Sequence, residues 1–166
     1  MDRCIKALLF TAFILMLAGC GGDDDPKRSS KIVGKWQMTA TDAEITAPGG
    51  DLRQYLIAEL AMLPGQADST TVRLESGEAT TIDIATIDFK DDGTYTATGK
   101  GTLKLGGVWE LTAGDKAVLF DEGTKSETAA LVRTLADSEL VVEFDLSDQI
   151  GLPKLKYLAI FSFEKI

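Results

Sequence analysis

Apolar and polar residues alternate along most of the chain after Ile32, and this alternation restricts the fold more than any other feature. The runs at 140–146 and 155–163 place every second residue on one apolar face, and a shorter run around Trp36 does the same. A period of two is typical of strands with one buried face and one solvated face. The sequence therefore predicts an all-β domain of antiparallel strands.

Short turn signals separate these runs, at 91–93, 99–101, 113–115 and 121–123, each with a glycine. They divide the chain into about eight or nine strands joined mostly by hairpins. A meander of this length closes readily into a barrel, because closure removes the exposed strand edges. A change of parity between Ile84 and Ile87 also predicts a β-bulge near Ala85 and Thr86.

One stretch breaks the alternation, at about 50–64, between the first and second predicted strands. Its apolar residues recur at helical spacing, at Leu52, Tyr55, Leu56, Leu60 and Leu63. Asp51 suits the N-terminal end of a helix, and Pro64-Gly65 predicts its end. This helical insertion either plugs one end of the barrel with its leucine face or forms a lid over a cavity.

The amino-terminal residues have the pattern of a secretory signal. Arg3 and Lys6 precede an apolar run at 7–18, too short for a membrane-spanning helix of about 20 residues. The following Leu17-Ala18-Gly19-Cys20 resembles the lipobox of bacterial lipoproteins. The resemblance implies that a lipoprotein signal peptide, 1–19, is removed. It also implies that Cys20 carries diacylglycerol and usually an amino-terminal acyl chain such as palmitate, enough for stable anchoring.

Residues 20–31 are expected to form the lipidated cysteine and a flexible tether, followed by the barrel domain at 32–166. The acidic cluster at 23–25 resembles the surface-export signal of Bacteroidetes lipoproteins. Gly21 stands where the inner-membrane retention signal of enterobacteria has aspartate. Both resemblances imply a lipid-anchored protein of the outer membrane in the cell envelope, facing the periplasm or the cell surface.

Composition excludes several function classes. Removal of 1–19 leaves 147 residues with no cysteine except Cys20, so no disulfide framework is expected. It also lowers the formal net charge from −9 to −10, because Arg3, Lys6 and Asp2 leave. A domain this acidic is repelled by nucleic acid. The expected membrane partner is the bilayer, reached through acylated Cys20.

Catalytic patterns are missing from the sequence. The chain has no histidine, the commonest general base and metal ligand. Asp91-Asp92-Gly93 lacks the later glutamate of a calcium loop and is expected to be a hairpin turn. Arg133 either faces inward to pair with a carboxylate ligand or faces solvent. The sequence therefore predicts a protein that is not an enzyme and that has no cofactor, no metal site and no catalytic residue.

Several motifs resemble a known family. Gly34-Lys35-Trp36 resembles the G-x-W motif of lipocalins. KIVGKWQMTA, IDFKDDGTYTA, GGVWELTAGDKAVLFD and VRTLADSELVVEFDL, in this order, resemble the lipocalin-like lipoprotein domains of Bacteroidetes. The resemblance implies that Gly34 and Trp36 close one barrel end and that Trp36 packs against an arginine near the last strand. No arginine lies near the end of FSFEKI.

Two functions follow from these expectations. In the first, the barrel binds a small hydrophobic or amphipathic ligand, lined by Trp36, Tyr95, Trp109, Phe144 and Phe161, with the helix as a lid. In the second, the same aromatic residues fill a solid core. The outer face or a loop then docks an envelope protein, as in protease inhibitors built on small barrels. The volume of the barrel interior distinguishes the two.

Overall fold

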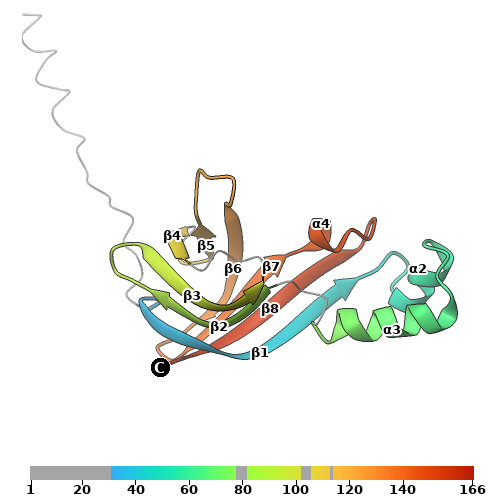
Figure 1. Cartoon of the computed structure of the whole chain (residues 1–166), viewed down its shortest axis with the longest axis horizontal. Coiled ribbons are helices and arrows are strands. Elements are labelled where there is room, and N and C mark those ends of the chain that lie inside the picture. The colour runs from blue at the N-terminus through green and yellow to red at the C-terminus, as the bar shows by residue number, and fades with distance from the viewer. Residues whose placement is uncertain (1–30, 78–81, 102–105, 113) are drawn as a thin grey trace, which may run out of the picture.

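Eight antiparallel strands form a closed barrel in which each strand pairs with its neighbours in the sequence and β8 pairs with β1 (Figure 1). The computed structural model describes residues 31–77, 82–101, 106–112 and 114–166. The strands are β1 (Gly34–Thr46), β2 (Ile82–Phe89), β3 (Thr94–Gly101), β4 (Gly106–Thr112), β5 (Ala117–Phe120), β6 (Thr128–Leu135), β7 (Glu139–Asp145) and β8 (Lys156–Lys165). The predicted antiparallel meander barrel, lipocalin-like in its architecture, is confirmed.

The strand register confirms the predicted irregularity in β2. Its pairing with β3 shifts between Ile84 and Thr86, which bends the strand and moves its inner face by one residue. The predicted turn at 99–101 is wrong, because these residues belong to β3, where Gly99 pairs with Ile84. Gly99 and Gly101 favour a turn when considered alone, but their pairing with β2 keeps them in the extended conformation of β3.

The insertion between β1 and β2 contains two helices, α2 (Leu52–Ala58) and α3 (Pro64–Glu75). The predicted bounds of about 50–64 are therefore wrong in detail. Asp51 caps α2 as expected, because its carboxylate accepts a hydrogen bond of 2.8 Å from the backbone N–H of Gln54. Pro64 begins α3 instead of ending a helix, since the first helical turn needs no backbone N–H from that residue.

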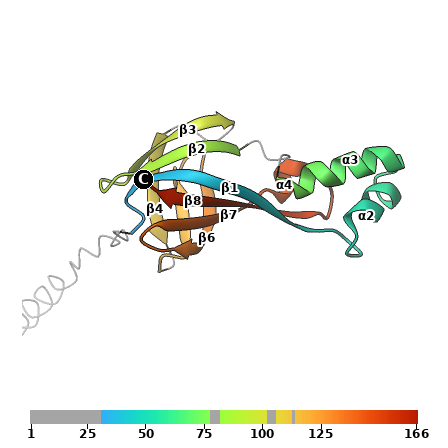
Figure 2. The same cartoon turned by 90° about the horizontal axis from the view of Figure 1, so that it is seen from below.

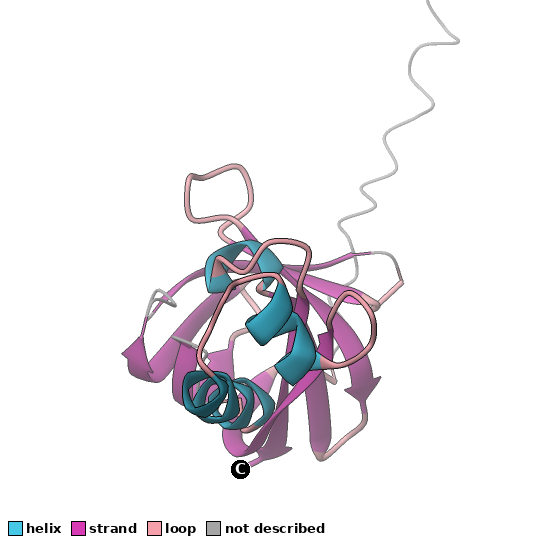
Figure 3. Cartoon of the chain, turned by 90° about the vertical axis from the view of Figure 1, so that its right-hand side faces the viewer, coloured by secondary structure: helices cyan, strands magenta, loops and turns pink. Residues whose placement is uncertain are grey.

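The two ends of the barrel differ. β1 pairs with β2 only over 34–37, but with β8 as far as Thr46, so β1 and β8 extend beyond the other strands (Figures 1 and 2). The helices α2 and α3 lie at this extension, which we call the helical end, and the short helix α4 (Ser147–Ile150) lies toward the same end. β1 begins and β8 finishes at the opposite, closed end. Viewed along the barrel, the helices lie in front of its opening (Figure 3).

The barrel core follows the predicted alternation. The apolar residues at alternate positions of β7 and β8 are buried: Leu140, Val142, Phe144, Tyr157, Ala159, Phe161 and Phe163. Leu158 and Ile160 on the opposite face of β8 are also buried, at 9% exposure each. The sequence pattern did not predict this second buried face.

Candidate functional site

Trp36 closes the end of the barrel opposite the helices. Its side chain is fully buried, and its Nε1–H donates a hydrogen bond of 2.7 Å to the backbone oxygen of Ile32. The Nζ of Lys165 lies 5.0 Å from the centre of the Trp36 ring and donates a hydrogen bond of 2.9 Å to Lys31 O. A lysine at the end of β8 thus packs on the tryptophan where the lipocalin pattern has an arginine.

Gly34 is favoured here by its backbone conformation and by the same contact. Its φ of +130° lies in the region that favours glycine, and a Cβ there would lie 2.7 Å from Cε of Lys165. The lysine side chain therefore passes directly over the position that lacks a side chain. The Gly34–Trp36 motif and Lys165 form one unit that joins the beginning of β1 to the end of β8.

All five aromatic residues that the sequence suggested as ligand-lining are buried inside the barrel, with exposures of 2% or less. Most of their rings contact other rings, and Phe120 on β5 is the centre of this network. Its ring centroid lies 5.2 Å from that of Tyr95 on β3, 6.1 Å from Phe89 on β2 and 6.2 Å from Phe144 on β7. Aromatic pairs at these separations are in direct contact.

The network extends from both sides of this centre. Phe144 contacts Phe161 on β8 at 5.6 Å, and Phe89 contacts Trp109 on β4 at 5.3 Å. Apart from the Phe144–Phe161 pair on the adjacent strands β7 and β8, these contacts join strands that do not pair with one another, so the rings meet across the interior. Phe89 and Phe120 were not among the predicted residues, although their alternating positions in β2 and β5 could have identified them. A role of the five residues in ligand binding stays a prediction.

One acidic side chain lies within the barrel wall. Asp121 is 3% exposed, and its Oδ1 accepts a hydrogen bond of 3.1 Å from the backbone N–H of Val108. Burial, and to a smaller extent the charge of Asp121 and its hydrogen bond with the phenol, raise the pKa of Tyr95 to about 12. The sequence pattern marked Asp121 only as a turn residue, so this buried polar pair was missed.

Arg133 faces outward. Its guanidinium forms two hydrogen bonds to the carboxylate of Glu44 on β1, at 2.7 and 2.9 Å, and one of 2.6 Å to Glu143 on β7. Because β8 lies between β7 and β1, the arginine crosses the outer face of β8. Glu143 and Glu44 are the register neighbours of Ile160 and Leu158, so the ion pairs flank the second buried face of β8.

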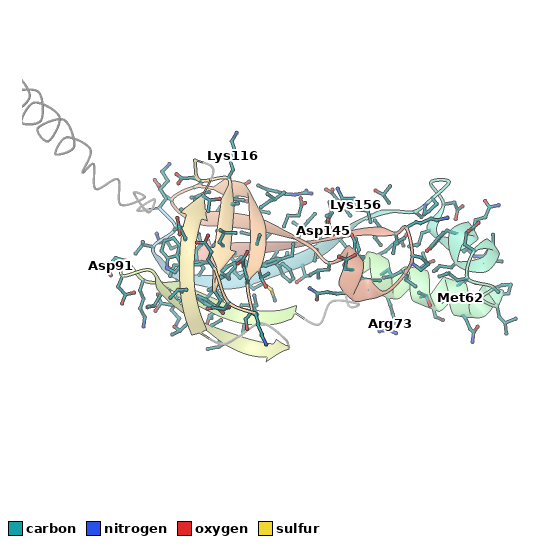
Figure 4. All side chains as sticks on the ribbon, turned by 90° about the horizontal axis from the view of Figure 1, so that it is seen from above. Met62, Arg73, Asp91, Lys116, Asp145 and Lys156 are labelled. Atoms are coloured by element: carbon teal, nitrogen blue, oxygen red, sulfur yellow. The ribbon has the colours of Figure 1, made fainter. Side chains whose placement is uncertain are left out.

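A groove at the helical end separates α3 from the connection between β7 and β8. Its central hollow, of about 230 Å³, is lined by Thr70, Arg73, Leu74, Gln149, Ile150 and Leu152. A hollow of about 430 Å³ adjoins it through Thr70, with Met62, Gly65, Gln66 and Ser69. Another, of about 360 Å³, adjoins it through Leu152, with Ser147, Asp148, Gly151, Pro153, Lys154 and Leu155. These three hollows form the helical-end groove, and Figure 4 labels Arg73 and Met62 beside it.

Hydrogen bonds fix the two walls of the helical-end groove relative to the barrel. The Tyr157 hydroxyl on β8 donates a hydrogen bond of 3.3 Å to Leu74 O in α3, and the Tyr55 hydroxyl in α2 donates to Pro153 O. Ala67 and Leu74 are buried on one face of α3. Thr71 lies between them on this face, and its buried hydroxyl has no hydrogen-bond partner among the described residues.

Within the part of the chain that the structure describes, no group of three or more cysteine, aspartate or glutamate side chains is arranged to hold a metal ion. No helix in these residues is long and apolar enough to cross a membrane. Cys20, the signal at 1–19 and nearly all of the tether lie outside the described residues. Comparison of the chain with known protein families, curated proteins and solved structures gives no match.

Proposed function

We propose that the chain is a membrane-anchored lipoprotein of the cell envelope whose filled barrel supports a protein-interaction surface at the helical end. One observation carries the proposal for the barrel: Phe120 on β5 contacts rings from β2, β3 and β7. Side chains that meet across the interior occupy the space that a ligand would need. Binding is then left to the outer surface, where the helical-end groove is the candidate site. We propose no catalytic activity.

The anchor and the groove lie at opposite ends of the domain in this proposal. Acylated Cys20 holds the chain at the outer membrane, facing the periplasm or the cell surface. The tether of 21–31 reaches about 35–40 Å when extended. It joins the barrel at the closed end, where Lys31 O accepts the hydrogen bond from Lys165. The helical end lies opposite (Figure 2), and therefore remains accessible to a partner in the envelope.

A small amphipathic ligand at the helical end is the second candidate. The observation that favours it is the buried Thr71 hydroxyl, which has no partner among the described residues. A buried hydroxyl without a hydrogen bond costs about 1–3 kcal/mol, and a bound polar group would remove this cost. In this case α3 covers the ligand, as the lid loop of the resembled family does.

Fractionation of cells tests the anchor. The Cys20→Ser variant is expected to leave the membrane fraction and to lose palmitate labelling, because no sulfur remains for the lipid. Cys4→Ser is the matched control, since Cys4 leaves with the signal peptide, and this variant is expected to remain anchored and labelled. Membrane association of Cys20→Ser equal to that of the control would refute the anchor.

Native mass spectrometry and photo-crosslinking test the interaction surface. The protein purified from its own host is expected to carry no small molecule, and a crosslinker at Ser69 is expected to capture a protein. A crosslinker at Lys35, at the closed end, is the control and should capture none. A small molecule that co-purifies in fixed ratio, and that Thr71→Val releases, would establish the second candidate instead.

A further inference from the structure

We propose that the helical-end groove binds an extended peptide segment of a partner protein, with an acidic side chain of the peptide at Arg73. The inference rests on the proposed interaction function and names the chemistry of the partner.

Arg73 differs from the other arginines within the described residues. Arg53 pairs with Asp68, and Arg133 pairs with Glu44 and Glu143. Arg73 forms no ion pair with any described residue, although the chain has a formal net charge of −9. It is also the single charged residue that lines the central hollow. A guanidinium in this position is available for a carboxylate, which it binds through two parallel hydrogen bonds.

The surroundings of Arg73 specify more than a charge. Leu74, Ile150 and Leu152 form the apolar part of the central hollow. A volume of about 230 Å³ is below the 300–1,000 Å³ that encloses most small ligands, but it holds one apolar side chain. The hollow therefore fits an apolar group next to a carboxylate. A phosphate polymer is a poor match, because its binding requires several cations along the site.

The groove is elongated. The hollow on one side of Arg73 contains Met62 and no charged residue, and the hollow on the other side contains Lys154 together with Asp148. Thr70 lines both the Met62 hollow and the central hollow, and Leu152 lines both the central hollow and the Lys154 hollow, so one extended occupant can contact all three. The charged residues that line the groove are Arg73, Lys154 and Asp148, so the lining has an excess of positive charge although the whole chain is acidic. This charge complements an acidic segment.

The walls of the groove offer hydrogen bonds as well as apolar contact. Hydroxyl and amide side chains occur along its length, at Gln66, Ser69, Thr70 and Gln149. A peptide presents one N–H and one C=O per residue to such groups. An acyl chain satisfies none of them and favours an enclosed apolar tunnel. The polar groups therefore favour a peptide over a lipid as the occupant.

Peptide binding to the full chain in detergent micelles tests the inference. The probes are short fluorescent peptides with a central aspartate or glutamate between leucines, matched asparagine and glutamine peptides, and lysine peptides. Fluorescence anisotropy is expected to show saturable binding of the acidic set only, weakening as salt is added. Arg73→Gln should weaken binding by about tenfold or more, and Arg73→Lys by less.

Arg53→Gln is the matched control. Arg53 is also an exposed arginine of the insertion, but it lies outside the hollows and pairs with Asp68. We expect this variant to bind the acidic peptides as tightly as the unaltered chain does. Circular dichroism melts of the three arginine variants verify that each one folds, so a loss of binding reports on the groove.

Several results would overturn the inference. One is that Arg73→Gln binds the acidic peptides as tightly as the unaltered chain does. Another is that the chain prefers neutral or basic peptides, or binds none of the peptides. A third is that decanoate displaces the bound peptides in a saturable manner. The crosslinking experiment at Ser69 shows whether only the acidic-peptide inference has failed or whether the proposed interaction function has failed as well. A protein captured at Ser69 independently of Arg73 preserves the interaction surface and refutes only the acidic peptide.

Discussion

Gly107 on β4 lies directly against the carboxylate of Asp121, because a Cβ atom on Gly107 would lie 1.9 Å from Oδ1 of Asp121. The same oxygen accepts the hydrogen bond from Val108 N, and the carboxylate also accepts one from Tyr95. The glycine therefore provides the space in which a buried acid is held by both neighbours.

Gly107→Ala is expected to destabilise the barrel by about 1–3 kcal/mol or more, because the new methyl group displaces a buried, hydrogen-bonded carboxylate. Urea unfolding measures the change in the free energy of unfolding. Gly65→Ala is the matched control. No atom lies within 4 Å of its added Cβ in the first turn of α3, so stability should stay the same or rise by up to about 1 kcal/mol. Equal losses in the two variants would contradict the steric explanation.

Trp36→Ala should cost about 3–5 kcal/mol, the usual cost of truncating a fully buried aromatic side chain. Thermal or chemical unfolding of the purified variant measures this loss. Lys35→Ala provides the comparison, because Lys35 is the exposed neighbour on the same strand and should change stability by no more than about 0.5 kcal/mol. A Trp36→Ala protein as stable as Lys35→Ala would show that the indole is not part of the core.

Lys165→Met tests the charge at the closed end. Methionine preserves most of the aliphatic contact beside Gly34 but removes the cation over the Trp36 ring and the hydrogen bond to Lys31 O. We expect a loss of about 0.5–2 kcal/mol in the free energy of unfolding. Lys165→Arg should retain most of the stability, because the guanidinium also packs on an aromatic face. If both variants behaved alike, the cation would have no role in closure.

The ion pairs across β8 predict a dependence of stability on pH. Hydrogen bonds from Arg133 hold the pKa of Glu44 below its ordinary value of 4.5. The folded state therefore binds the proton of Glu44 less readily than the unfolded state does. The stabilisation is present above pH 4.5 and is lost as the pH falls through the lower, folded pKa.

The Glu44→Gln variant isolates this contribution. Its melting temperature should lie below that of the unaltered protein at neutral pH, and the difference should shrink as the solution is acidified below pH 4.5. Glu139→Gln is the control, since Glu139 is exposed and belongs to none of the ion pairs among the described residues. A difference for Glu44→Gln that stays constant from neutral to acidic pH would argue against the ion pair.

Titration of the Tyr95 phenol is expected to lower the stability of the fold at alkaline pH. Its pKa is raised from an ordinary value of 10 to about 12, chiefly by burial and then by Asp121. The folded state retains a proton that the unfolded state loses, so its stabilisation is complete below pH 10 and is lost as the pH rises through about 12. Ultraviolet difference spectra should show a late phenolate step that Tyr95→Phe removes. A titration of Tyr95→Phe identical to that of the unaltered protein would contradict this assignment.

The alternation in the sequence was sufficient to predict the inner face of the barrel and the bulge in β2. Both depend on a period of two along the chain, which a reader can follow without knowing which strands pair. The boundaries in the insertion could not be predicted in the same way. Pro64 is compatible with the end of one helix and with the first turn of another, and the choice depends on tertiary contacts of α3 such as the hydrogen bond from the Tyr157 hydroxyl to Leu74 O.

The sequence also directed attention to Gly34 and Trp36, but not to Lys165, because the resembled pattern has an arginine in that role. A lysine near the end of a strand has no local feature that shows what it contacts. Only pairing of β1 with β8 places it over the ring of Trp36. The alternation in β5 places Phe120 on the inner face, but only barrel closure brings its ring against rings from β2, β3 and β7.

By itself, the sequence determined which residues face inward, because side-chain direction in a strand is a local property of successive residues. It also contains the contiguous motif at 17–20 that resembles a lipobox, and lipidation of Cys20 stays a prediction. Tertiary structure alone decided which distant residues meet: the rings around Phe120, the three strands joined by Arg133, and the groove between α3 and the β7–β8 connection. These contacts depend on barrel closure and strand register, which bring together segments that are far apart in the chain.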